Sequence, residues 1–131
     1  MKTKIQDIIL GILILAAPSL GGCRNEHFAS KFSEANFKKV ARGDSLSKVE
    51  QLLGRPLACV VRENQGFEGK ALGGKQILIV EFQALSQWEN DPQVYVDLHY
   101  SQKRLNFRPF RQYRVILQNG RVFETISSDV D

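Results

Sequence analysis

The sequence predicts an α+β protein in which two short N-terminal helices pack on one face of a small antiparallel β-sheet. Three observations indicate this fold. Apolar residues recur at helical spacing between residues 27 and 53, β-branched runs follow from residue 58 onward, and Asn119-Gly120 separates the last two runs. The expected element order is therefore two helices followed by five strands.

The first 22 residues are typical of a lipoprotein signal peptide. Lys2 and Lys4 precede an apolar run at residues 8–17, which is too short to span a membrane and has the length of a signal-peptide core. Leu20-Gly-Gly-Cys23 then resembles the bacterial lipoprotein cleavage box, which implies cleavage before Cys23 and acylation of this cysteine. The alternative is an ordinary secretory signal that leaves Cys23 as a thiol.

We therefore divide the chain into a signal peptide (1–22), a short lipid-anchored tether (23–27) and one domain (28–131). Removing 22 of 131 residues leaves 109, which is the size of a single small domain. Cys59 is then the second cysteine of the mature chain. If Cys23 carries lipid, Cys59 has no disulfide partner, and its apolar neighbours predict a buried, unreactive thiol.

Two helices are expected before the sheet. Apolar residues between 27 and 41 predict the first, and Gly43 is expected to end it. Ser45 is a suitable N-cap for the second helix, whose apolar stripe covers residues 46–53. Gly54 and Pro56 then stop it.

Five β-strand candidates follow the helices. The run at 76–82 is almost continuously apolar, which predicts a central strand covered by the helices. Residues 94–100 alternate between two faces, and residues 111–118 and 121–127 flank the Asn119-Gly120 hairpin signal. The run at 58–62 either pairs into the sheet or only leads into it.

The segment from Asn36 to Pro56, NFKKVARGDSLSKVEQLLGRP, resembles the signature of the SmpA/OmlA (BamE-like) outer-membrane lipoproteins. The matching positions are Phe37, Val40, Gly43, Ser45, Val49, Leu52, Leu53, Gly54 and Pro56. The resemblance implies two helices on a small antiparallel sheet, and it implies contact with another lipoprotein of the barrel-assembly machinery and with anionic phospholipid. Asp44 departs from the pattern, because the family usually has an apolar residue there.

A basic, aromatic stretch is the best candidate binding region. No acidic residue occurs between Leu98 and Val122, and the cations there are Lys103, Arg104, Arg108, Arg111, Arg114 and Arg121. Arginine interleaved with aromatic residues such as Phe107 and Phe110 suits a protein interface or anionic lipid headgroups. We expect partner or lipid contacts at Arg104, Arg108, Phe110 and Arg111. The alternative is a solvated loop whose aromatic residues turn inward, and the export signal argues against nucleic acid.

Trp88 is a further candidate contact, either as an exposed anchor for a partner or as a ring folded over one edge of the sheet. Asp97 and His99 share a strand face, but i and i+2 neighbours lie about 7 Å apart, so a polar outer face is the preferred interpretation. His27 and His99 are solitary, so no metal site is predicted. No nucleophile is placed beside Asp97 and His99, and residues 66–74 lack the spacing of a phosphate-binding loop, so neither catalysis nor a cofactor is predicted.

These features predict a non-enzymatic lipoprotein at the periplasmic face of the outer membrane. It would be an accessory subunit in the assembly of β-barrel proteins or in envelope maintenance, acting through protein and anionic-lipid contacts. The alternative is a periplasm-facing inhibitor or sensor that binds an exported enzyme through the face of its sheet.

Overall fold

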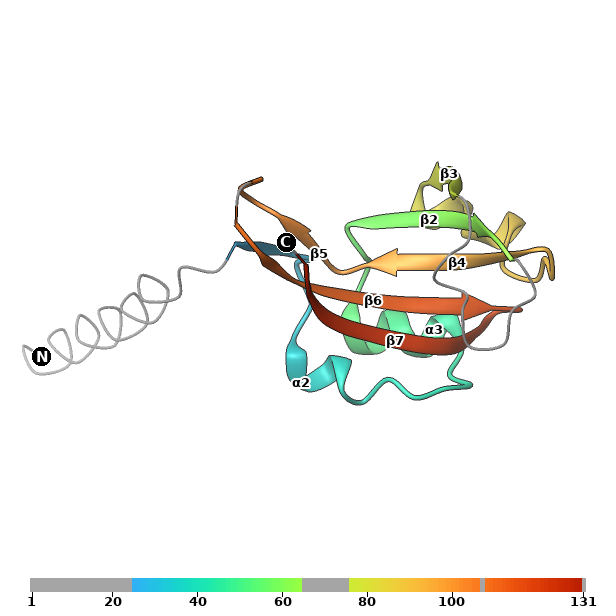
Figure 1. Cartoon of the computed structure of the whole chain (residues 1–131). Coiled ribbons are helices and arrows are strands. Elements are labelled where there is room, and N and C mark those ends of the chain that lie inside the picture. Colours follow the sequence, from blue (N-terminus) through green and yellow to red (C-terminus); the bar gives the residue numbers. More distant parts are fainter. Residues whose placement is uncertain (1–24, 65–75, 107, 131) are drawn as a thin grey trace, which may run out of the picture.

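The fold is a five-stranded antiparallel sheet with two short helices on one face (Figure 1). The structure, a computed structural model, describes residues 25–64, 76–106 and 108–130; the expected signal peptide, Cys23 and Phe107 lie outside them. Its elements are β1 (Glu26–Phe28), α2 (Glu34–Phe37), α3 (Leu46–Leu53), β2 (Ala58–Glu63), β3 (Gln76–Val80), the 3-10 helix η2 (Phe82–Gln87), β4 (Val94–His99), β5 (Ser101–Lys103), β6 (Phe110–Gln118) and β7 (Arg121–Val130).

The main sheet has the strand order β3-β2-β4-β6-β7, and β1 and β5 form a separate antiparallel pair. β2 pairs with β3 on one side and with β4 on the other. The chain segment that contains η2 therefore crosses β2 to connect the end of β3 with the start of β4. The open question about residues 58–62 is thereby resolved, because they are a paired inner strand. In the described part of the chain, no helix has the length and apolar character needed to cross a membrane.

The hydrophobic core lies between the helices and one face of the sheet. Val49 and Leu53 of α3 are fully buried and belong to the same cluster as Leu98 of β4 and Val115 of β6. The predicted apolar stripe of residues 46–53 is therefore confirmed as the packing face of α3. Figure 1 shows α2 and α3 on one side of the sheet, next to β6 and β7.

The segment before α3 attaches this helix to the sheet. Gly43, with φ 93°, donates its N–H to Val122 O at 2.8 Å, and Val122 donates back to Asp44 O at 2.8 Å. Ser45 Oγ accepts the N–H of Lys48 and caps the helix as predicted. The Gly-Asp-Ser sequence therefore has a structural role, since it both starts α3 and pairs with β7.

The predicted first helix is wrong in extent. Residues 26–28 form β1, and α2 is a single turn that begins after Ser33, whose hydroxyl accepts the N–H of Asn36 at 3.1 Å. The aromatic residues of this segment do not form a helical stripe. Instead, the rings of Phe28, Phe32 and Phe37 gather around Tyr113 of β6, with Phe32 and Tyr113 centroids 4.9 Å apart.

The prediction that residues 76–82 form a central strand is also wrong. β3 is an edge strand that ends at Val80, and Phe82 begins η2. Ile77, Leu78 and Ile79 are 51%, 44% and 63% exposed. The continuous apolar run indicated a strand buried on both faces. In the structure β4 pairs with the other side of β2, so β3 lies at the edge of the sheet.

The β6–β7 hairpin is confirmed. Asn119 and Gly120 have φ of 52° and 73°, the left-handed conformation that a two-residue hairpin turn requires. β6 pairs along its whole length with β7, with one register irregularity at Ile116/Leu117. The alternation predicted for residues 94–100 also holds, since Val96, Leu98 and Tyr100 join the helix-side core.

Candidate functional site

Asn25, at the start of the described chain, is hydrogen-bonded to the basic, aromatic stretch around residues 104–108. Its side-chain amide donates to the carbonyl oxygens of Leu105 and Arg108, each at 2.8 Å, and its Oδ1 accepts the Leu105 N–H at 2.6 Å. The backbone of Arg104 also donates to Asn25 O at 2.8 Å. One buried side chain thus satisfies three backbone groups of a turn that lies 80 residues away in the sequence.

We call the described residues of this turn, 103–106 and 108–111, the basic tip. Arg104 and Arg108 are exposed, and Leu105 beside them is 44% exposed. Phe110 is half-buried, with Lys103 Nζ 5.6 Å from its ring centre. The outer surface of the tip therefore combines two exposed guanidinium groups with an exposed leucine.

Arg111 of the tip forms an ion pair within the domain. Its guanidinium lies 3.2 Å from Asp129 of β7 and donates to Ser127 Oγ at 3.1 Å. Its backbone N–H donates to Glu26 Oε1, which connects β6 to β1. Of the four tip residues predicted to make contacts, Arg104 and Arg108 are thus the most accessible, while Phe110 and Arg111 also stabilise the tip.

The predicted tether, 23–27, is held by the fold over its described part. Glu26 and His27 pair with Lys103 and Gln102 in the β1–β5 ladder, and Asn25 binds the tip. The chain is therefore fixed to the domain from two residues after Cys23 onward.

Trp88 lies at the opposite end of the sheet from the tip. It follows η2 and lines an open groove with Ile77 of β3 and Val94, the first residue of β4. β4 then runs to His99, and the chain enters β5 and the tip beyond it. The structure consequently separates Trp88 from the arginines and does not combine them in one site.

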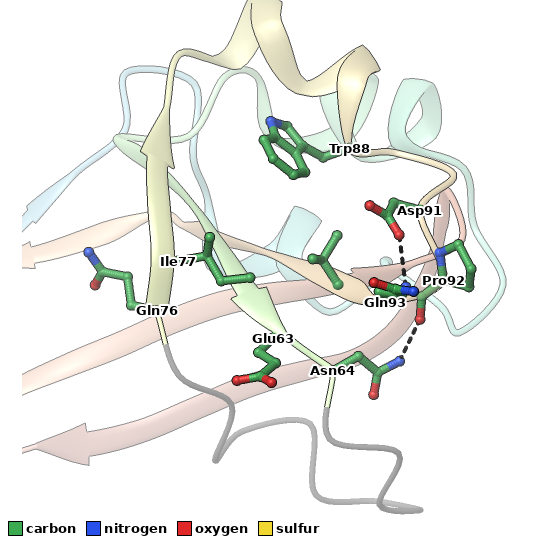
Figure 2. A pocket seen from close by; sticks show the side chains of 9 residues that line it. Glu63, Asn64, Gln76, Ile77, Trp88, Asp91, Pro92 and Gln93 are labelled. Carbon is green, nitrogen blue, oxygen red and sulfur yellow. Dashed lines mark hydrogen bonds between the residues drawn. The ribbon is translucent and has the colours of Figure 1, made fainter.

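The groove beside Trp88 has an apolar floor and acidic margins (Figure 2). Trp88 points toward β3, and Ile77 points from β3 into the same hollow. Glu63 and Asp91 lie at its margin, and none of the described residues that line it is a lysine or arginine. Trp88 is half-buried and packs on the core, so the expectation of a ring folded over a sheet edge agrees with its placement.

Hydrogen bonds hold the wall of this groove in place. Asn64 Nδ2 donates to Pro92 O at 3.2 Å, and the Asn64 N–H donates to Gln93 O at 2.9 Å. Asp91 Oδ1 accepts the N–H of Gln93 at 2.9 Å and forms a tight turn (Figure 2). The turn at residues 91–93 thus forms one side of the groove.

A third cluster surrounds Asp97 on the sheet face away from the helices. Asp97 is fully buried and forms a two-pronged contact with Arg114, whose Nε is 2.9 Å from Oδ1 and whose Nη2 bonds Oδ2. Arg62 Nε donates to Oδ2 at 3.0 Å, and His99 Nε2 lies 3.2 Å from the same oxygen. Asp97 and His99 thus lie on a polar outer face, as expected, but the expected separation of the two side chains is wrong, because His99 Nε2 lies 3.2 Å from the buried Asp97 carboxylate.

The pKa of Asp97 lies well below its ordinary value. Burial alone would raise this pKa, but the contact with His99 and the hydrogen bonds and positive charge of Arg114 outweigh it. The carboxylate is therefore permanently ionised near neutral pH and serves to hold two arginines. The Asp97 carboxylate is therefore better suited to stabilising the fold than to transferring protons, because a group that transfers protons needs a pKa near the working pH.

Cys59 is buried, as predicted, and among the described residues it forms no disulfide. Burial, together with the nearby Glu81, raises the pKa of its thiol to about 12, so the reactive thiolate is scarce at neutral pH. Across residues 25–64, 76–106 and 108–130, no three His, Cys, Asp or Glu side chains form a group that could hold a metal ion.

The residues that sequence reasoning missed are Asn25, Arg62 and the acidic margin of the groove. Arg62 follows four uncharged residues within β2, which was a usable sign that it faces a buried carboxylate. Comparison of the chain with protein-family models, curated proteins and solved structures returns no match.

Proposed function

We propose that this protein is a non-enzymatic lipoprotein of the outer membrane, anchored through Cys23 and facing the periplasm. In this proposal it is an accessory subunit in the assembly of β-barrel proteins or in envelope maintenance. Its basic tip contacts anionic phospholipid at the membrane surface, and another lipoprotein of the barrel-assembly machinery is its protein partner. No cofactor is involved.

The observation that carries the proposal is the bonding of Asn25 to the tip. Cys23 is two residues from Asn25, so at most about 7 Å of extended chain separates their Cα atoms. Since Asn25 binds the backbone of Leu105 and Arg108, a lipid on Cys23 would hold the tip against the headgroups. A long flexible tether would let the domain take many orientations relative to the membrane. A tether of two residues would restrict the domain to orientations in which the tip faces the membrane.

The chemistry of the tip suits such a surface. Arg104 and Arg108 are exposed beside the exposed Leu105, which matches a layer of anionic headgroups above acyl chains. Each cation near an anionic membrane contributes about 1 kcal/mol. This attraction would add to the membrane affinity that the lipid anchor provides. It would also determine which side of the domain faces the membrane.

The assembly role is supported by the resemblance of residues 36–56 to the SmpA/OmlA (BamE-like) lipoproteins. That resemblance implies two helices on an antiparallel sheet, and the protein has an antiparallel sheet with two short helices on one face. The signature residues Gly43 and Ser45 have structural roles here. Partner contact is accordingly expected at the tip and not at the signature.

Intact-mass spectrometry of the full-length protein, purified from bacterial membranes, tests the anchor. The expected mass corresponds to cleavage before Cys23 plus a diacylglyceryl group and one further acyl chain. Cys23→Ser should abolish the modification and release the protein from the outer-membrane fraction. An unmodified Cys23 in a chain cleaved elsewhere would refute the lipoprotein proposal.

Vesicle flotation tests the tip in an unlipidated form, residues 23–131 with Cys23→Ser, which contains the whole described core. We expect binding to vesicles containing phosphatidylglycerol, weakened at least roughly tenfold by Arg104→Glu with Arg108→Glu. The matched control is Lys39→Glu with Lys48→Glu, two exposed cations outside the tip with the same change in charge. Equal loss in both double variants would mean that only net charge matters.

A pulldown of the tagged full-length protein from outer membranes in mild detergent tests the partner. Recovery of barrel-assembly subunits with the lipidated protein, and their loss with the Arg104 and Arg108 double variant, would support the accessory role. Recovery of one soluble periplasmic enzyme, alike with and without the lipid, would instead support an inhibitor.

A further inference from the structure

The groove beside Trp88 lies in an acidic part of the described chain. No lysine or arginine occurs in residues 76–102, and the acidic residues there are Glu81, Glu89, Asp91 and Asp97. The groove itself has no lysine or arginine among its described lining residues. Its charge is therefore complementary to a cation, in contrast to the charge of the basic tip.

Two carboxylates without ion pairs border the groove. Glu63 is exposed at the end of β2, and Asp91 lies in the turn before β4. Among the described residues neither takes part in an ion pair, whereas Asp97 and Asp129 are both paired with arginine. Figure 2 shows the Asp91 carboxylate directed into the hollow below Trp88, with Glu63 on the side of the hollow away from Trp88. Two separate negative charges thus border one apolar floor.

The ring of Trp88 lacks the cation that comparable rings of this protein have. Outside the aromatic cluster around Tyr113, each half-buried phenylalanine ring of the described chain has a cation over it. The pairs, with the distances from the cation to the ring centre, are Arg42–Phe123 at 5.0 Å, Arg55–Phe82 at 5.3 Å and Lys103–Phe110 at 5.6 Å. Trp88 is half-buried too, but none of the described cations lies over its ring. Tryptophan attracts cations more strongly than phenylalanine does, so its ring suits the cation of a ligand.

We propose that this groove binds a linear aliphatic amine that carries two or more ammonium groups. The methylene chain of the ligand lies on the apolar floor formed by Ile77 and Val94. One ammonium group contacts Asp91 and the ring of Trp88, and a second contacts Glu63. The volume of about 850 Å³ is sufficient for such a small molecule.

Other classes of ligand fit the groove less well. An anionic headgroup would be repelled by Glu63 and Asp91, and a wholly apolar ligand would remove water from both carboxylates without replacing it. A metal ion would lack ligands, because no group of three His, Cys, Asp or Glu side chains exists within residues 25–64, 76–106 and 108–130. The site is also independent of the lipid anchor, since it lies at the end of β4 away from the tip.

Trp88 provides a local reporter of binding, because it is the only tryptophan in the chain. The test measures its fluorescence in the unlipidated form, titrated with 1,5-diaminopentane at constant ionic strength. We expect a saturable change in emission. 1-Aminopentane, which lacks the second ammonium group, should bind roughly threefold to fivefold more weakly. 1,5-Pentanediol, which has no charge, should produce no change at the same concentrations.

Two charge variants locate the two ends of the ligand. Asp91→Asn keeps an oxygen that accepts the Gln93 N–H, so the turn is retained, and it should weaken the binding of both amines. Glu63→Gln should weaken the diamine roughly threefold to fivefold and leave 1-aminopentane unaffected. The matched control is Glu81→Gln, which removes the same charge at an exposed residue that does not line the groove, and it should leave both affinities unaltered.

A third variant tests the ring. Trp88→Leu keeps an apolar side chain but removes the aromatic face, so the diamine should bind roughly threefold more weakly. Isothermal titration calorimetry measures this affinity, because the variant has no tryptophan to report it. Circular dichroism checks that the variant is folded.

Several results would overturn the proposal. Equal affinities for the diamine and 1-aminopentane would show that the second ammonium group has no site. Equal losses in Glu63→Gln and Glu81→Gln would reduce the effect to the general acidity of this end of the domain. Absence of a saturable change would exclude the groove as an amine site. Tighter binding of a capped lysine–lysine dipeptide than of the diamine would assign the groove to a protein partner instead.

Discussion

The two faces of the main sheet are both buried at their centres, but different interactions stabilise them. Toward the helices, Val96 and Leu98 of β4 pack against an apolar cluster that includes Val49. On the opposite face, Tyr95 and Asp97 of the same strand are also buried, and Asp97 is surrounded by charged groups. The first face depends on the hydrophobic effect, which is not directional and does not require one particular packing partner. The second depends on hydrogen bonds that require particular residues on three strands.

The largest effect is expected on the helix face from Val49→Asp. Val49 is fully buried in α3, so the substitution would place a carboxylate without a partner inside the core. We expect loss of the folded state, seen as loss of the cooperative transition in urea monitored by Trp88 fluorescence.

The control for this variant is Glu50→Asp, the adjacent exposed position of the same helix, which should unfold at nearly the wild-type urea concentration. A Val49→Asp protein with a wild-type transition would show that α3 does not cover the sheet.

A smaller effect is expected on the opposite face from Asp97→Asn. The substitution keeps the size of the side chain but leaves Arg62 and Arg114 facing a neutral group, and both arginines are largely buried. Removing one partner of a buried ion pair costs about 3–5 kcal/mol, and the partial exposure of the arginines reduces this to about 2–4 kcal/mol. Urea denaturation at pH 7 measures the loss.

The matched control is Asp129→Asn, which removes the partner of Arg111 at an exposed site. Exposed ion pairs contribute about 0–1 kcal/mol, so this variant should retain nearly all its stability. Equal losses in the two variants would contradict a special role for the buried cluster.

The two faces should also respond differently to acid. The folded-state pKa of Asp97 lies below its ordinary value of 3.8, so below about pH 4 the unfolded chain binds a proton that the folded chain does not. Asp97 therefore contributes stability at pH values above about 4, and this contribution is lost as the pH falls toward the folded-state pKa.

Urea denaturation between pH 7 and pH 3 tests this dependence. The wild type should lose more stability than Asp97→Asn over this range, so the difference between the two proteins should shrink as the pH falls. A constant difference would show that Asp97 does not titrate with a lowered pKa.

The helix face was predictable from sequence because its signals are local. Ser45, the stripe of α3 and the Asn119-Gly120 turn each lie within a few residues of the groups they organise. The first helix was predicted too long because apolar residues at mixed spacing fit a helical face as well as an aromatic cluster around Tyr113. The edge position of β3 was missed because an apolar run does not specify how many neighbours a strand has.

The candidate sites were only partly predictable because their contacts join distant segments. Arg104 and Arg108 were identified from charge alone, but their position beside the chain start depends on Asn25, whose partners are 80 and 83 residues away. Asp97 meets Arg62 and Arg114 only through the register of β2, β4 and β6. Such contacts follow from strand pairing, which one sequence does not specify.

The smallest effect is expected on the helix face from Ser45→Ala. Ser45 Oγ accepts the N–H of Lys48 at 3.2 Å, and loss of this cap leaves an amide at the start of α3 without its partner. N-cap substitutions of this kind cost about 1 kcal/mol, so the urea midpoint should fall modestly while the tip keeps its binding to anionic vesicles. Ser47→Ala is the matched control, since Ser47 is exposed in the same helix but is not the cap. If both alanine variants lost the same stability, the cap would not be responsible. If only Ser45→Ala lost stability, α3 would be stabilised by its N-cap as well as by its buried stripe.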